Sequence, residues 1–213
     1  MQIIEFLNGK TDFRDLKTHR GCSGYCSGLA AALILFCNCT TPRLTIHAVG
    51  NTPVCKTQTP ERVLVLWGSA WRENQKEPAL RREIAAREIA KFFNSNPCFS
   101  HAQILESSRE MPALMLTDAD ALKLATNLQI PVQKVIFVRV EELGPLLMIY
   151  LSPILWEGGS EVILRVRVLN VEASRLESDI SIHRKDTGPF VLRGTGALEK
   201  DLDAALSSVF TQE

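Results

Sequence analysis

The spacing of hydrophobic and polar residues predicts a strand followed by a helix, twice over, in the middle of the chain. Residues 63–67 form a continuous apolar run of strand length, which is typical of a strand covered on both faces. Pro78 begins a helix with one apolar face. A second strand near residues 102–105 leads to a second helix, which begins after Thr117 and ends at Pro131.

The next part of the chain has the pattern of strands alone. Residues 134–140 and 146–151 are apolar enough for two further strands. Gly158 and Gly159 follow, and we expect them to form the tight turn of a hairpin, because glycine readily adopts the positive φ that such turns need.

Two strands with a strict two-residue period come next. Apolar and polar side chains alternate over residues 162–168 and 176–182, which indicates a hairpin with one face exposed to water. Thr195 precedes a last amphipathic helix. The predicted order is β-α-β-α-β-β-β-β-α, and the predicted fold class is α/β, a mixed sheet of about six strands with three helices packed on it.

A short apolar run, LAAALILF, lies near the start of the chain at residues 29–36, after a basic flank. It has the length of a signal-peptide core and is too short for a stable membrane span. We therefore expect residues 1–38 to be a leader or signal segment and residues 39–60 a tether. Residues 61–213 are expected to form a single α/β domain.

The order of basic flank, apolar core, cysteine and Thr-Thr-Pro resembles a bacterial lipoprotein signal, in which the cysteine after the cleavage site is acylated. The resemblance implies that Cys39 carries a lipid anchor, with Cys37 as the alternative. Small residues are expected before the acylated cysteine, and Phe36 departs from that pattern. A plain secretory leader and an apolar helix packed in a core are the other interpretations.

Six cysteines are present, four of them around the apolar run. A zinc site built from those four is disfavoured, because polar turn residues separate the ligand pairs of zinc loops. If Cys39 is acylated and the leader removed, Cys55 and Cys98 remain. Cys55 lies before the first strand and Cys98 follows the helix that returns to that level, so a disulfide is predicted between them. The alternative is two independent cysteines.

Composition and charge exclude some partners. Lys and Arg balance Asp and Glu at 24 each, and the basic residues are dispersed. A neutral chain without a basic stripe is not expected to bind nucleic acid or anionic lipid.

Motifs of catalytic chemistry are missing. The sequence has no HExxH pair, and Gly68-Ser69-Ala70 is not the GxSxG turn of a hydrolase. We therefore expect no catalytic residue, no metal and no cofactor. The alternative is a secreted or periplasmic hydrolase or small-ligand-binding protein.

The loop after the first strand carries Trp67, Trp71 and Arg72. Tryptophan and arginine are enriched at binding hot spots, and open α/β sheets place ligands at the carboxyl ends of their strands. These three residues are therefore candidates for binding a partner, and Trp156, next to the predicted Gly158-Gly159 turn, is a further candidate. The alternative is that one or both rings cover the hydrophobic core.

From Arg62 onward the element order resembles a group of bacterial envelope domains. The features are the strand VIFVRV, the meander VILRVRVLNVEAS and the closing helix ALEKDLDAAL. The group comprises the domain of curli-secretion-channel lipoproteins, the amino-terminal domain of the Tol-Pal translocation protein, and the lipoprotein activators of penicillin-binding proteins. The resemblance carries no diagnostic motif. It implies a non-catalytic, membrane-tethered periplasmic module that binds another envelope protein and is anchored in the outer membrane.

Overall fold

The structure is a computed structural model, which describes residues 41–49, 59–71, 73, 75–107, 115–149, 156–189 and 191–210. Along the chain, its elements are β1 (Thr41–Val49), β2 (Glu61–Ser69), α1 (Pro78–Ser95), β3 (Phe99–Glu106), α2 (Asp118–Thr126), β4 (Lys134–Ile149), β5 (Trp156–Asn170), β6 (Arg175–Pro189) and α3 (Thr195–Phe210).

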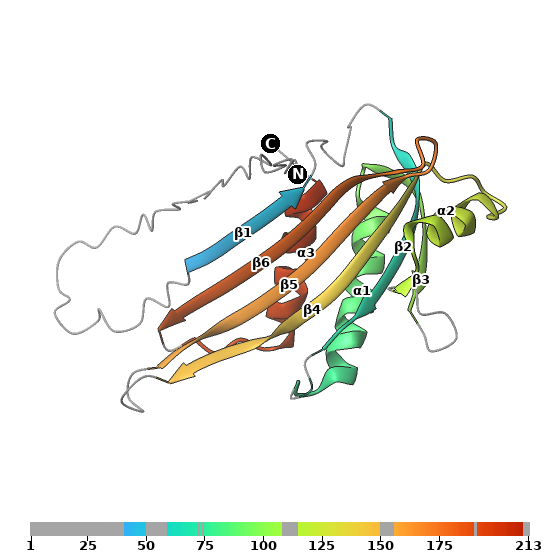
Figure 1. Ribbon diagram of the computed structural model, residues 1–213. Helices are drawn as coiled ribbons and strands as arrows, with labels where there is room; N and C mark the ends of the chain where they lie inside the picture. Colours follow the sequence, from blue (N-terminus) through green and yellow to red (C-terminus); the bar gives the residue numbers. More distant parts are fainter. Residues whose placement is uncertain are drawn as a thin grey trace, which may run out of the picture.

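One mixed six-stranded sheet, in the order β1-β6-β5-β4-β2-β3, forms the body of the fold. β2 runs parallel to its neighbours β3 and β4, and the other neighbouring strands are antiparallel. Helices α1 and α3 lie together on one face, and α2 packs on the other, as Figure 1 shows. The predicted fold class, α/β with six strands and three helices, is confirmed.

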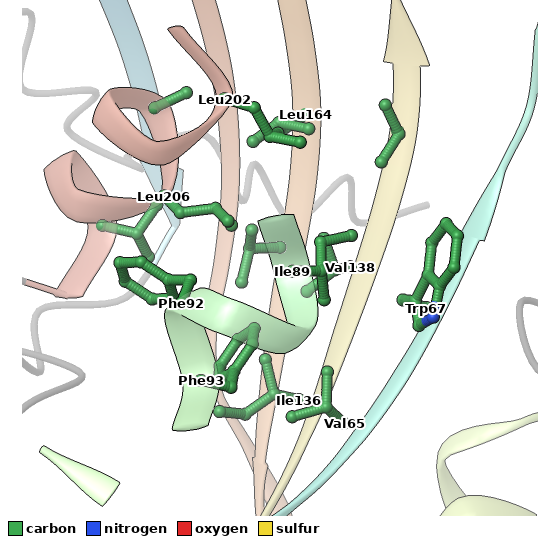
Figure 2. Close-up of a cluster of buried hydrophobic side chains, with 14 of the residues drawn as sticks. Val65, Trp67, Ile89, Phe92, Phe93, Ile136, Val138, Leu164, Leu202 and Leu206 are labelled. Atoms are coloured by element: carbon green, nitrogen blue, oxygen red, sulfur yellow. The ribbon is translucent and has the colours of Figure 1, made fainter. Parts of the chain in front are cut away.

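The larger core lies between the sheet and the pair α1 and α3. Figure 2 shows Phe92 and Phe93 of α1 facing the strands, with Leu206 of α3 beside them. The ring centroids of Phe92 and Phe93 lie 5.6 and 5.4 Å from that of Phe210. Aromatic pairs at such distances add about 0.5–1.5 kcal/mol each beyond the burial of their area. These contacts fix the two helices on one face of the sheet.

A smaller core lies under α2. Leu64 and Leu66 of β2 contact Ala121 and Ala125 there, so β2 is buried on both faces, as its continuous apolar run predicts. The hydroxyl of Thr117 accepts a hydrogen bond from the amide of Asp120 at 3.2 Å, which makes Thr117 the expected cap of α2.

Strand β1 lies in the segment that we expected to be a tether. It forms the edge of the sheet, antiparallel to β6, and its Leu44 and Ile46 pack against the larger core. Threonine favours strands, and proline is tolerated at an edge, so Pro42 does not prevent the pairing. Local composition cannot reveal pairing with a strand far along the chain. The sheet therefore begins upstream of residue 61.

Strand β4 is continuous, although its two halves were predicted as separate strands. A bulge between Val140 and Glu142 shifts the alternation of side chains along the strand by one position. Gly158 and Gly159 lie inside β5, so the prediction that they form a hairpin turn was wrong. A Cβ on Gly158 would lie 2.0 Å from the carbonyl oxygen of Val191, and close approach of backbone explains this glycine.

None of the described helices is both long and apolar enough to cross a membrane.

Candidate functional site

The face of the sheet opposite α1 and α3 presents charged side chains where β4, β5 and β6 lie side by side. Along β5, Leu164 and Val166 are buried in the larger core. Because side chains alternate along a strand, Arg165 and Arg167 face the other way. We call this surface the open face, and its charged residues are Arg139, Glu161, Arg165, Arg167, Asp179, His183 and Lys185.

Arg165 and Asp179 form a bidentate ion pair across β5 and β6. The guanidinium Nε and Nη2 donate to the two carboxylate oxygens at 3.0 and 2.7 Å. This hydrogen bonding, together with the negative charge of Asp179, raises the pKa of Arg165 above its ordinary value. Both side chains are thus held in one geometry, while the arginine stays 51% exposed.

A shallow hollow of about 240 Å³ lies over this part of the open face. Arg139 stands directly opposite Arg165 in the strand register, and like charges in that position repel. Arg167 lies over the ring of Phe137, 5.2 Å from its centroid, and pairs with Asp118 of α2. The residues lining the hollow are Phe137, Arg139, Arg165, Arg167, Leu176 and Asp179.

Glu161 forms a second charged group on the same face. Its carboxylate lies 2.7 Å from Nε2 of His183 and 3.1 Å from Nζ of Lys185. Burial raises the pKa of Glu161, but the hydrogen bonds to His183 and Lys185 outweigh burial and leave the pKa below its ordinary value. Arg139 also has a carboxylate partner, Glu141, at 3.3 Å. The open face therefore carries two separate groups of paired charges.

A buried polar cluster on the opposite face fixes the loop before α3. Asp201 of α3 accepts a hydrogen bond from the hydroxyl of Ser160 and lies 3.4 Å from Nε of Arg184. Arg193 of the loop pairs with Asp186 at 2.6 Å. These contacts hold the loop against β5 and β6, which is why it can cross Gly158 so closely.

Next to that loop the molecule exposes large apolar side chains. Leu147, Ile149 and Leu192 are 56%, 65% and 81% exposed, and with Trp156 they line an apolar hollow of about 220 Å³. We call these four residues the apolar end. Sequence reasoning offered Trp156 as a candidate and missed the other three residues, although the stretch from Gly144 to Trp156 contains no charged residue.

Two of the three predicted partner-binding residues, Trp67 and Trp71, lie among the described residues. Trp67 is 2% exposed within the larger core, as Figure 2 shows on β2, so a partner cannot reach its ring. Trp67 therefore fits the alternative interpretation, in which its ring covers the hydrophobic core. Trp71 is partly buried and packs against the same core. Arg72 lies outside the described residues, and partner binding by Trp71 and Arg72 stays a prediction.

Of the cysteines in these predictions, the structure describes Cys98 alone. Cys39, the predicted lipid anchor, and Cys55 lie outside the described residues. Cys98 is disulfide-bonded and 6% exposed. Its carbonyl oxygen accepts a hydrogen bond from the amide of Glu61 at 2.9 Å, so the end of α1 does return to the start of β2. All other cysteines lie outside the described residues, so the pairing of Cys98 with Cys55 stays a prediction.

Among the described residues, no group of three or more histidine, cysteine, aspartate and glutamate side chains could hold a metal ion. No family model and no curated protein matches the chain.

Several solved structures have a similar arrangement of elements. The PelC dodecamer from Paraburkholderia phytofirmans is 14% identical, over 80% of this chain and 99% of that one, with a TM-score of 0.46. Lipoprotein GNA1162 from Neisseria meningitidis is 13% identical, over 70% and 98%, with a TM-score of 0.40. Protein XCC0632 from Xanthomonas campestris is 13% identical, over 76% and 86%, with a TM-score of 0.38. Likenesses of this degree say nothing about function.

Proposed function

We propose that this chain is a non-catalytic binding or assembly module of the bacterial cell envelope, tethered to a membrane on the periplasmic side through a lipid on Cys39. The observation that carries the binding role is the open face. Its arginines and carboxylates are held in fixed pairs, with Arg165 and Asp179 joined by two hydrogen bonds. Such a prearranged polar surface suits docking of another envelope protein, because little side-chain entropy is lost on binding.

The tether is supported by the sequence and by the place where the sheet begins. The apolar run at 29–36 and Cys39 precede β1 closely, and β1 starts at Thr41. An anchor at Cys39 therefore holds one end of the sheet near the membrane, and the outer membrane is the proposed location. Trp71 and Arg72 remain proposed contacts for a partner.

The second candidate function, binding of a small ligand, rests on the hollow lined by Arg139, Arg165 and Arg167. Its volume of about 240 Å³ is below the roughly 300–1,000 Å³ of typical ligand pockets. Each of the three guanidiniums also has a carboxylate partner already. Docking of a protein surface accounts for these features better.

Site-specific photocrosslinking in cells tests the binding role. A photoreactive residue at Ser181, which lies beside Arg165 on the open face, is expected to form a defined crosslinked product with one envelope protein. The same residue at Lys91, which is 65% exposed on α1, serves as the matched control and is expected to form none. Equal products from both positions, or none from Ser181, contradict the proposal.

A further inference from the structure

The apolar end is built by the regular alternation of β4 beyond the helices. Leu143, Leu147 and Ile149 share one face of the strand, the face that carries the larger core. Their exposure rises from 0% at Leu143 to 56% at Leu147 and 65% at Ile149. The apolar face of the sheet thus continues past the part that the described helices cover.

The loop before α3 adds a side chain to this surface and is held in place. Val191 is buried and Arg193 is paired with Asp186 at 2.6 Å, while Leu192 between them is 81% exposed. A leucine held in a fixed, exposed position is ready to be covered, and burial of such a side chain contributes about 1.5–3 kcal/mol.

The strand register places this end beside the point where the chain enters the sheet. Thr41 of β1 is opposite Thr187, which is opposite Gly159, which is opposite Leu146. Three strand spacings separate β1 from β4, or about 14 Å. Cys39 lies two residues before Thr41, a reach of about 7 Å. The apolar end and the proposed anchor therefore belong to the same end of the molecule.

The chemistry of the apolar end favours a lipid surface over a second copy of the chain. Tryptophan is enriched where the hydrocarbon of a bilayer meets the headgroups, and leucine and isoleucine partition below that level. A standard protein interface buries about 800 Å² on each partner. Such an interface engages about 20–30 residues a side, whereas the apolar end, within the described part of the chain, comprises four.

We propose that the apolar end inserts into the interfacial layer of the membrane beside the N-terminal anchor, so that two contacts orient the sheet on the membrane. The inference rests on the tether proposed above. It is nevertheless tested separately, because the experiment uses the full chain carrying Cys39→Ser, which removes the acylated residue from every sample.

The test is flotation with vesicles of phosphatidylcholine and phosphatidylethanolamine. We expect Leu147→Asp with Leu192→Asp to lower the bound fraction at least fivefold. The matched control is Val49→Asp with Met115→Asp, which adds the same charge at residues 74% and 85% exposed elsewhere on the molecule, and it is expected to bind like the parent. Equal binding by the two double variants overturns the inference.

Fluorescence supplies a local readout that is independent of the charge changes. Acyl-brominated phosphatidylcholine is expected to quench about a third of the emission of the full chain, because Trp156 is one of three tryptophans. The substitution Trp156→Phe is expected to abolish this quenching. Quenching that is absent, or that survives Trp156→Phe, overturns the inference. A dimer in light scattering that the Leu147 and Leu192 substitutions dissociate would also overturn the inference, because the apolar end would then bind a second copy of the chain.

Discussion

Two adjacent arginines on α1 differ sharply in what surrounds them. Arg81 is buried, and its Nη1 donates to the carbonyl of Leu143 at 2.7 Å and to Glu142 at 3.1 Å. Arg82 pairs with Glu106 at the surface, where its side chain is 51% exposed. A buried carboxylate that loses its partner is costly, whereas an exposed ion pair contributes little.

We therefore expect Arg81→Met to lower the free energy of unfolding by about 3–5 kcal/mol. Arg82→Met is expected to change it by no more than about 1 kcal/mol. Urea denaturation of both variants measures the difference. The double variant Arg81→Met with Glu142→Leu should regain most of the loss, because the buried carboxylate is removed together with its counter-charge. Equal losses from the two arginines would contradict the assignment.

The lowered pKa of Glu161 predicts how the stability of the fold depends on pH. Its pKa in the folded chain is lower than the ordinary value of 4.5. A lowered carboxyl pKa stabilises the fold above the unfolded pKa, and this contribution disappears as pH falls through the folded value. The stability advantage of the natural chain over Glu161→Gln should thus be full near pH 6 and shrink below about pH 4.5. An advantage that grows on acidification would refute the pairing with His183 and Lys185.

At the scale of single residues, the burial of Trp67 could have been predicted. Val63, Val65 and Trp67 share one face of β2 by the two-residue period, and all three lie in the larger core. A ring that covers the core was the alternative interpretation of Trp67, and β2 continues beyond it to Ser69. The apolar end was harder to find, because sequence alone does not reveal where the helices stop covering β4.

At the scale of elements, the sequence predicts those whose pattern is local. Helices α1, α2 and α3 and the hairpin of β5 and β6 have clear periodicity, α2 also has its predicted cap, and all of these elements are present. β1 was not recognised because its partner β6 is remote in sequence, and Gly158 was misinterpreted because its close neighbour Val191 comes from a distant loop. Remote contacts of this kind leave little trace in a single sequence.

The disulfide of Cys98 belongs to the same scale, because it would join the start of β2 to the end of α1. Pairing with Cys55 closes a loop of about 43 residues, worth roughly 3–4 kcal/mol on the chain-entropy model. Cys55→Ser, Cys98→Ser and the double variant should therefore lose the same stability in thermal or urea unfolding. Losses that add in the double variant, or a nonreduced peptide map that links Cys98 to another cysteine, would show a different pairing.

At the scale of the whole molecule, the sheet has surfaces of different character. The apolar end lies at the same end of the sheet as the start of β1. The open face runs along β4, β5 and β6 on the side away from α1 and α3, two helices that Figure 1 shows together on one face of the sheet. Attachment at the apolar end leaves the open face accessible to a second protein. The two proposed roles, membrane attachment and partner binding, thus use different surfaces.

Metabolic labelling with a fatty acid, in a host that processes lipoproteins, tests the central claim of a membrane-tethered module most directly. We predict label on the natural chain, no label on Cys39→Ser, and full label on Cys55→Ser, the matched cysteine control. Loss of label in Cys37→Ser instead would move the anchor by two residues. Absence of label on the natural chain would contradict the account.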